Sequence, residues 1–426
     1  MCATIVDRVA AAALAWFNKM IPAKKHAANE HTVFSAIVVH ESWDSDAVGG
    51  SEQFRVVSAG TGTKCVGVSG LCREGFVVAD SHAETICRRS FLRYLYHELK
   101  HAPSDSIFDL PPPSSSSPRD DATPSHRRRH LKPSCQLYMY VSEAPCGDAA
   151  LYDLTAASLE VIHEAKVKKQ KVDHRCDSGD VVATVPCRTT GAKEAHSTAH
   201  SNVVGVARVK SGRSDILQAN RTMSMSCSDK LCQWMVCGLQ GALLSRWFDP
   251  IVLHGVVVSQ PEDADPASFH DALRRCVSRG RNCATFPTSS HPFRLSKSPT
   301  RPSPSGLSLN WAAGCPDDSA VEYTIGARGV KMGAKKTLDD FAAKQKMSSR
   351  LCRRRLGRLA FDLAAEETSK PGDDSAAPTA QLPCTYDDLK TALQTDYCAS
   401  KKALRALPAF QTWRGNPAEY SAFALP

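Results

Sequence analysis

Three short segments of this 426-residue sequence contain residue types that could bind a metal ion and move a proton. They are His82-Ala83-Glu84, Pro145-Cys146-Gly147-Asp148 and Ser226-Cys227-Ser228-Asp229-Lys230. One imidazole and two thiolates form a three-ligand zinc site whose fourth coordination position stays open. A water at such a position has its pKa lowered toward neutrality and becomes a nucleophile. We therefore predict one catalytic zinc ion bound by His82, Cys146 and Cys227.

Glu84 lies two residues after His82, and we predict that it carries protons instead of binding the metal. A carboxyl group in that position can take a proton from the attacking water and deliver one to a departing amine. Each segment by itself can be explained without a metal site, because most His-x-Glu pairs are structural and most Pro-Cys-Gly sequences are turns. The three together, each opening a helical segment after a strand or loop, favour a zinc site at helix N-termini, where the partial positive charge stabilises thiolates.

The hydrophobic pattern around these segments predicts a single α/β domain. Helices are predicted at 6–20 and 82–97, as one long helix after Cys227, and in Lys- and Arg-rich C-terminal segments. Strands are predicted at 32–42, 52–60, 75–81, 251–259, 309–314 and 322–330, and another begins at Cys135 and runs into a helix start after Cys146. Polar segments, several of them rich in Pro and Ser, at about 103–133, 164–202, 284–306 and 366–383 are predicted to be disordered insertions.

Composition restricts the partners and the compartment. The net charge of +9 is spread along the chain, which favours a polyanionic partner, although many soluble enzymes are equally basic. No apolar stretch reaches 18 residues and no signal peptide is visible, so we expect no membrane partner. The 17 cysteines lack the dense spacing of a disulfide scaffold, so we expect a reducing intracellular compartment, nucleus or cytoplasm. The run HRRRH at 126–130 could be a nuclear signal, an RNA-binding arm or a solvated linker.

Longer blocks around the three segments can be compared with known families. The blocks DSHAETICRRSFLRYL, EAPCGDA and MSMSCSDKLCQWMVCGLQGALLS follow one another, with TGTKC upstream and SRLCRR, YDDLK and a TW…NP ending downstream. In this order, and over nearly the whole chain, they resemble the adenosine deaminase domain of RNA-acting enzymes. The resemblance implies a cytidine-deaminase-like mixed sheet flanked by helices, with a basic helical C-terminal part. Related cytidine deaminases place their two cysteines together as PCxxC, whereas Cys146 and Cys227 lie far apart, as in the RNA-acting branch.

Basic residues cluster in the C-terminal half, for example Arg350 to Arg358 and Lys390 to Arg405. Spacing alone favours a solvated helix face, but the resemblance implies a buried inositol hexakisphosphate, a polyanion that needs many cationic partners. Matching motifs imply contacts from Arg88, Arg89, Lys230, Arg353, Lys390, Tyr397, Lys401 and Trp413. They also imply a relay through Asp80 and Lys230 from the zinc site to this cofactor. The chain departs from the family pattern at Ala79, Gln233 and Asn416, where Asn, Arg and Lys are common, so the full contact set is open.

The resemblance also implies a substrate. A base inside a duplex cannot reach a buried metal, so the enzyme must flip the base or use an unpaired one. Thr63 and Lys64 resemble family residues near the target nucleotide. No double-stranded-RNA-binding module precedes the domain in this sequence, which favours tRNA over long duplex RNA, and by analogy adenosine 37 beside the anticodon of alanine tRNA. DNA is not an expected partner, and the oligomeric state stays open.

Three alternatives remain. The first is editing of structured mRNA. The second is a catalytically idle RNA-binding protein, which the intact His82, Glu84, Cys146 and Cys227 disfavour. The third is a purely structural zinc ion, in which case Glu84→Gln would leave function unchanged.

Overall fold

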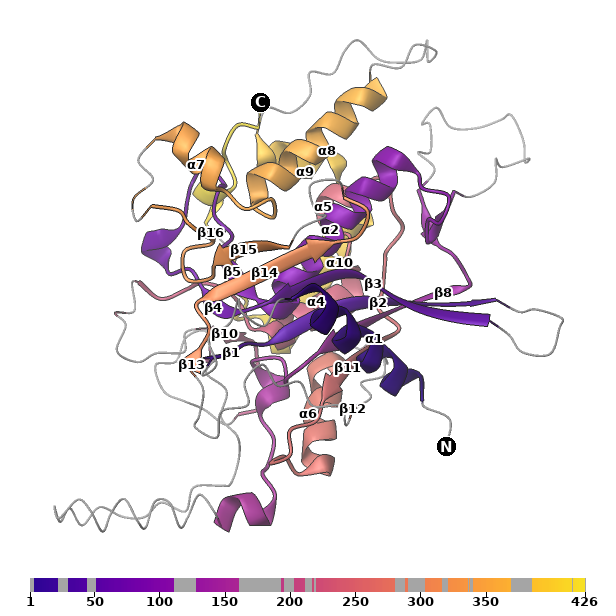
Figure 1. The fold of residues 1–426 in the computed structure, drawn as a ribbon. Helices are drawn as coiled ribbons and strands as arrows, with labels where there is room; N and C mark the ends of the chain where they lie inside the picture. Colours follow the sequence, from indigo (N-terminus) through magenta and orange to yellow (C-terminus); the bar gives the residue numbers. More distant parts are fainter. Residues whose placement is uncertain are drawn as a thin grey trace.

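The computed structural model describes residues 4–21, 30–43, 51–110, 128–160, 203–210, 217, 220–279, 305–315, 321–335, 337, 340–368, 385–415 and 417–425, and the backbone of 193–194, 288–289 and 303–304. These residues form an eight-stranded mixed sheet with helices on both faces, which confirms the predicted fold class (Figure 1). The strand order is β12 (Thr288–Ser289), β11 (Gly255–Ser259), β8 (Cys135–Val141), β2 (Phe34–Trp43), β3 (Ser51–Thr61), β14 (Leu307–Ala312), β15 (Glu322–Ile325) and β16 (Val330–Lys331). Strand β11 runs parallel to β8 and β12, and the other neighbours are antiparallel.

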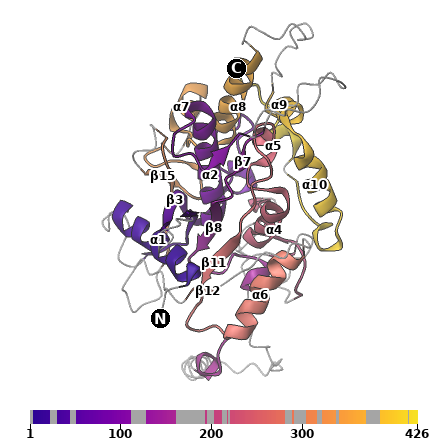
Figure 2. The same ribbon diagram turned by 90° about the vertical axis from the view of Figure 1, so that its right-hand side faces the viewer.

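The central strand β2 is apolar on both faces, so each face needs a covering layer. Phe34, Ala36 and Val38 pack against the first helix, whereas Ile37 and Val39 belong to the core on the opposite face. Because successive side chains of a strand point to opposite faces, this alternation requires helices on both sides of the sheet. Helix α1 (Ile5–Met20) covers one face and α2 (Ala83–His101) the other, as Figures 1 and 2 show.

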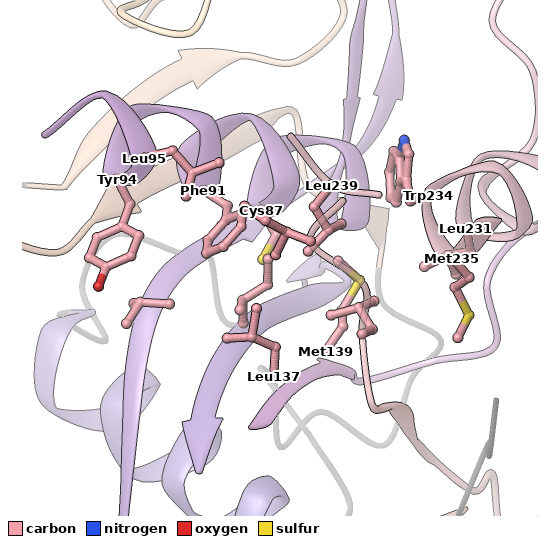
Figure 3. Close-up of a cluster of buried hydrophobic side chains, with 14 of the residues drawn as sticks. Cys87, Phe91, Tyr94, Leu95, Leu137, Met139, Leu231, Trp234, Met235 and Leu239 are labelled. Atoms are coloured by element: carbon pink, nitrogen blue, oxygen red, sulfur yellow. The ribbon is translucent and has the colours of Figure 1, made fainter. Parts of the chain in front are cut away.

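The core beneath α2 joins three elements that are far apart in the sequence. Cys87, Phe91 and Leu95 of α2 lie in one cluster with Leu137 and Met139 of β8 (Figure 3). The same cluster includes Leu231, Trp234 and Met235 of α4 (Cys227–Cys237), together with Leu239. This shared core fixes α2, β8 and α4 relative to one another, and all three predicted metal ligands lie at or near the ends of these elements.

The C-terminal part is helical, as predicted. It consists of α7 (Phe341–Met347), α8 (Arg353–Thr368), α9 (Tyr386–Leu393) and α10 (Asp396–Arg405). Helix α8 packs on α2, while α9 and α10 pack on α5 (Gly241–Leu244) and α10 also packs on α4. The remaining described helix of the sheet layers is α6 (Pro266–Ser278), which packs on α4. No helix among the described residues is long and apolar enough to cross a membrane.

Four predicted elements are wrong in detail, and one of them, the strand predicted at 322–330, is two antiparallel strands, β15 and β16, joined by a turn. The long helix after Cys227 is broken, because Gly238 has a φ of 84° and the Gln240 side chain donates to the Cys237 carbonyl at 3.0 Å. The strand predicted at 75–81 is regular only at β5 (Asp80–His82), which pairs with β4 (Thr63–Cys65). Its apolar residues Phe76 and Val78 are buried by irregular packing instead. The helix start after Cys146 is a single 3₁₀ turn, η3 (Asp148–Ala150).

Parts of the segments predicted to be disordered form regular structure. Strands β6 (Phe108–Asp109) and β7 (His130–Leu131) pair within 103–133. Strand β9 (Lys193–Glu194) pairs with β10 (Arg208–Val209), and β13 (Ser303–Pro304) pairs with β1 (Glu30–His31). Backbone hydrogen bonds between strands order these short polar segments, and amino-acid composition does not reveal such pairing. Helix α8 also extends into 366–383, as far as Thr368. Residues 111–127, 161–192, 195–202, 290–302 and 369–384 lie outside the described residues.

Candidate metal centre and basic cavity

The structure brings the three predicted ligands together at the starts of three segments. His82 ends β5 and precedes α2, Cys146 precedes η3, and Cys227 is the first residue of α4. The His82 Nδ1 atom lies 3.7 Å from the Sγ atom of Cys146 and 3.7 Å from that of Cys227. Tetrahedral zinc with Zn–S near 2.3 Å and Zn–N near 2.0 Å places such atoms about 3.6 Å apart. The donor set and its spacing therefore fit one zinc ion with an open fourth position.

Hydrogen bonds fix the two cysteine segments relative to each other. The Cys227 amide donates to Cys146 Sγ at 3.4 Å, and the Ser228 amide donates to the Cys146 carbonyl at 3.0 Å. The Ser228 hydroxyl donates to the Pro145 carbonyl at 3.0 Å and accepts from the Ala149 amide at 3.0 Å. Ser228, which follows a predicted ligand directly in the sequence, thus determines how the second cysteine segment lies on the first.

Glu84 lies in the first turn of α2 and is 2% exposed. Burial raises the pKa of its carboxyl group, and the neighbouring Cys146 thiolate raises it further against the opposing charges of Lys210 and His82. Among the described residues, Glu84 does not belong to the ligand group of His82, Cys146 and Cys227. A buried carboxyl beside the metal ligands, with a pKa above its ordinary value, is suited to exchange protons.

Lys210, which sequence reasoning missed, lies at the centre of a buried charge network. Its Nζ atom donates to Asp80 Oδ2 at 2.8 Å, to Asp80 Oδ1 at 3.1 Å and to Cys227 Sγ at 3.0 Å. Lys230 also pairs with Asp80, which agrees with the predicted Asp80–Lys230 relay. Lys210 connects this relay directly to a metal ligand. A lone lysine next to a predicted insertion carries no motif, so no sequence signal could have identified it.

The charged groups of this network keep one another in their ionised forms. Burial alone would raise the pKa of Asp80, but the ammonium groups of Lys210 and Lys230 hold it well below its ordinary value. Burial would lower the pKa of Lys210, but Asp80 and Cys227 raise it well above its ordinary value. Asp80 also accepts from the His82 amide at 3.0 Å. The carboxylate thus orients the ligand-bearing strand while it binds two lysines.

A cavity of about 480 Å³ lies next to this network and contains most of the predicted phosphate contacts. Seven of the eight predicted residues line it, namely Arg88, Arg89, Lys230, Arg353, Lys390, Lys401 and Trp413. Tyr397 is buried beside it, where its hydroxyl accepts from Gln233 at 3.3 Å. Arg405 and Arg414, absent from the predicted contacts, also line the cavity, and the Arg405 guanidinium lies 4.6 Å from the Trp413 ring.

The cations of the cavity outnumber its anions. Among the described lining residues the carboxylates are Asp80, already bound to two lysines, and Asp387, which Lys390 contacts at 3.2 Å. Burial, together with the charges of Arg405 and Lys390, lowers the pKa of Lys401 to about 8. Burial lowers the pKa of Arg89 to about 10. Buried charge of one sign is unfavourable unless an opposite charge compensates it, so these residues fit a polyanion such as inositol hexakisphosphate.

The three departures from the family pattern are distributed unevenly. Ala79 and Gln233 line the cavity, so a small apolar residue and a neutral amide stand where the pattern commonly has polar or cationic groups. Asn416 lies outside the described residues.

The two predicted substrate residues lie on β4, beside the metal centre. Thr63 is paired with His82 in the register of β4 and β5, and Lys64 is paired with Ser81. The stem of Lys64 packs against Gly326, where an added Cβ would lie 3.1 Å from the Lys64 Cβ. Both residues are partly exposed, while the Thr63 hydroxyl oxygen itself is buried, so the strand holds two polar side chains next to a predicted ligand.

Comparison with known proteins places this geometry in a family. The model of the adenosine-deaminase (editase) domain matches residues 58–417, a stretch that includes the predicted ligands and the predicted cavity residues. The chain is 32% identical to tRNA-specific adenosine deaminase 1 of Drosophila melanogaster over 66% of this chain and 60% of that protein's length. It is 27% identical to tRNA-specific adenosine deaminase 1 of Mus musculus over 98% of this chain and 99% of that protein. It is also 27% identical to the double-stranded RNA-specific editase B2 of Rattus norvegicus, over 93% of this chain and 47% of that protein. With most of its length matched and the proposed ligands gathered at one centre, the chain belongs to the adenosine-deaminase (editase) domain family.

Proposed function

We propose that this chain is a zinc-dependent deaminase that hydrolyses adenosine to inosine in tRNA, at adenosine 37 of alanine tRNA. One observation carries the chemistry: the Sγ atoms of Cys146 and Cys227 each lie 3.7 Å from His82 Nδ1. The buried Glu84 lies beside this group. The choice of tRNA is supported by the similarity to the tRNA-specific adenosine deaminase 1 proteins of Drosophila melanogaster and Mus musculus.

The residues have separate tasks in this reaction. His82, Cys146 and Cys227 would hold zinc, which when bound lowers the pKa of a water molecule toward neutrality. Glu84 takes a proton from the attacking water and delivers a proton to the amino group on C6 of adenine. The C6–N bond then breaks, ammonia leaves and inosine remains. Thr63 and Lys64, on the strand next to His82, are proposed to contact the target nucleotide.

The basic cavity has a role distinct from that of the metal centre. We propose that it holds inositol hexakisphosphate, with the eight predicted residues and Arg405 as partners. Such a polyanion would supply the negative charge that the cavity wall lacks. Asp80, Lys210 and Lys230 connect this cavity to Cys227, so the ligand in the cavity and the ligands of the metal share one network.

The compartment proposed for this reaction is a reducing intracellular one, nucleus or cytoplasm. The cysteines in the described part of the chain are free thiols, which is consistent with such an environment.

Purified protein incubated with total tRNA tests the proposal, with adenosine-to-inosine change scored by sequencing. We expect inosine at one position beside the anticodon of alanine tRNA. The Glu84→Gln variant should retain its zinc while its rate falls by roughly 10²–10⁴-fold, the usual contribution of a general acid–base. Inosine at no tRNA position, from protein that contains stoichiometric zinc, would contradict tRNA as the substrate.

Double-stranded RNA is a second candidate substrate. It is supported by the similarity to the rat double-stranded RNA-specific editase B2 over 93% of this chain. Competition between long duplex RNA and deacylated tRNA distinguishes the two. If tRNA is the substrate, duplex RNA should inhibit deamination of tRNA weakly and acquire little inosine itself.

A further inference from the structure

A second buried charge cluster lies next to the two cysteine segments and includes Asp148, Asp229 and Arg279. Asp148 and Asp229 are both 0% exposed, and each follows a proposed zinc ligand, Cys146 or Cys227, by two residues. Arg279, at the C-terminal end of α6, has a side chain that is 5% exposed. Its Nη1 atom lies 2.9 Å from Asp229 Oδ1, and its Nε atom lies 3.9 Å from Asp148 Oδ2. A single guanidinium therefore faces both carboxylates.

Each carboxylate also accepts a hydrogen bond from a backbone amide of the segment 203–210. Asp229 Oδ2 accepts from the Ser226 hydroxyl at 2.6 Å and from the Arg208 amide at 2.9 Å. Asp148 Oδ1 accepts from the Gly205 amide at 2.8 Å. These bonds fix the position of both carboxylates, and because each aspartate follows its cysteine by only two residues, a displaced carboxylate would also displace the cysteine.

The guanidinium of Arg279 is itself held from several directions. Its Nη1 atom donates to the Val206 carbonyl at 3.2 Å, and its Cζ atom lies 5.2 Å from the centre of the Phe410 ring. Arg275, one turn earlier on α6, lies 3.6 Å from Asp148 and donates to the Leu151 carbonyl at 2.8 Å. Helix α6 thus presents fixed positive charge along the line where the two cysteine segments meet.

We propose that Arg279 is a positioning residue that sets the separation of the Cys146 and Cys227 thiolates for the metal. The two cysteines are 81 residues apart and lie on separate segments, so their distance depends on what joins those segments. Without Arg279, the buried Asp229 carboxylate would lose the cation that pairs with it, and its repulsion by Asp148 would push the two segments apart. The planar Arg279 guanidinium donates to Asp229 and lies within ion-pair distance of Asp148, which Arg275 also approaches, so it links the two segments in a geometry that a lysine ammonium cannot reproduce. This inference rests on the proposed zinc function, because it concerns the ligands of that ion.

Zinc affinity measured by chelator competition tests the inference on the full chain. We compare the wild type with Arg279→Met, Arg279→Lys and Arg274→Met. Arg274 is the matched control, because it lies on the same helix but has a 69% exposed side chain paired with Asp271. Residues that orient metal ligands typically cost about 10–100-fold in affinity when replaced, so we expect that loss for Arg279→Met. Arg279→Lys should lose at least threefold, and Arg274→Met should stay within twofold of the wild type.

The absorption spectrum of the cobalt-substituted protein gives a second readout, because it reports the arrangement of the thiolates around the metal. We expect the bands of Arg279→Met and Arg279→Lys to shift, and those of Arg274→Met to match the wild type. If Arg279→Met does not fold by circular dichroism, Arg279→Lys decides the question, since it retains the positive charge. A folded Arg279 variant with the zinc affinity and cobalt spectrum of Arg274→Met would overturn the positioning role.

That outcome is distinguishable from failure of the proposed function. If the wild type itself binds no stoichiometric zinc, the zinc-dependent reaction is wrong, and the positioning role is wrong with it. If the wild type binds zinc tightly and the Arg279 variants bind it equally well, only the positioning role is wrong.

Discussion

At the scale of single residues, the centre depends on buried charges that occur in pairs. Asp80 and Lys210 are both buried, and each holds the other in its charged form. Removing one member of such a pair leaves an uncompensated charge in a medium of low dielectric constant, whereas exposed pairs contribute little. Lys210 also donates to Cys227, so its charge favours the thiolate form that a metal ligand requires.

Lys210→Met tests this dependence. The change removes the hydrogen bonds to Asp80 and Cys227, and loss of one partner of a buried pair costs about 3–5 kcal/mol of unfolding free energy. Denaturant unfolding measures this loss, with Lys331→Met as the control because Lys331 contacts Glu322 only at 4.0 Å and is partly exposed. The control should lose no more than about 1 kcal/mol. Equal unfolding free energies for the two variants would show that Lys210 is not needed to compensate Asp80.

At the scale of elements, the centre depends on how chain segments begin. His82 precedes α2, and Cys227 opens α4 after the N-cap residue Ser226, whose hydroxyl accepts from the Asp229 amide. The Cys146 segment instead turns at Gly147, whose φ of 108° and ψ of −138° are essentially restricted to glycine. A Cβ at this glycine would lie 2.3 Å from the Ser226 hydroxyl oxygen, so the two cysteine segments approach closely only because that atom is absent.

Gly147→Ala should therefore impair the metal centre. The strained backbone costs about 1–3 kcal/mol, and the added methyl group pushes Cys146 away from the start of α4. We expect a lower melting temperature and at least a tenfold loss of zinc affinity, measured by calorimetry and chelator competition. Gly333→Ala is the matched control, because Gly333 has a φ of 87° but no atom within 4 Å of its added Cβ. It should lose stability but retain zinc affinity; the same zinc affinity in both variants would contradict the steric argument.

At the scale of the whole molecule, the basic cavity lies where the C-terminal helices meet α2 and α4. Its wall combines Arg88 and Arg89 of α2, Lys230 of α4 and Lys401 of α10, residues that span most of the chain. Without a polyanion these cations repel one another, and this repulsion adds to the burial that lowers the pKa of Lys401. With a polyanion bound, the same cations would join the sheet domain to the C-terminal helices.

The Lys401→Met substitution should lower the unfolding free energy if a polyanion is bound and raise it if the cavity holds none. With a bound polyanion, the loss of one charge-assisted bond lowers the unfolding free energy at pH 7 by about 1.5–3 kcal/mol. Without one, the change removes repulsion and raises stability. Lys401 has a folded-state pKa of about 8, below its ordinary 10.5, so an empty cavity would make stability rise with pH through that window. Melting curves of the purified protein between pH 7 and 9.5 measure both effects, with the exposed Lys402→Met as control. A higher melting temperature for Lys401→Met at pH 7 would contradict the polyanion.

Much of the fold and of the candidate site could be predicted from the sequence. The run of β-branched residues in β2 and the helical spacing of Val9, Ala13 and Phe17 predicted their elements, because β-branched residues favour strands and burial on a helix face imposes a period. The prediction of one long helix after Cys227 was wrong at Gly238, because the apolar spacing continues across the break while the backbone there turns. The strand at 75–81 was wrong for a related reason: burial of Phe76 and Val78 does not require strand geometry.

The sequence by itself determined which residues could do the chemistry, since few side chains can bind zinc or transfer a proton, and His82, Glu84, Cys146 and Cys227 stand in recognisable surroundings. The family resemblance implied seven further residues that the structure places on the cavity wall. Only the tertiary structure revealed Lys210 between Asp80 and Cys227, Arg405 on the cavity wall, and Arg279 between Asp148 and Asp229. The physical reason is that a buried charge is stable only when groups of opposite charge or hydrogen-bonding partners lie within a few ångströms of it. Packing brings those partners together from distant parts of the chain.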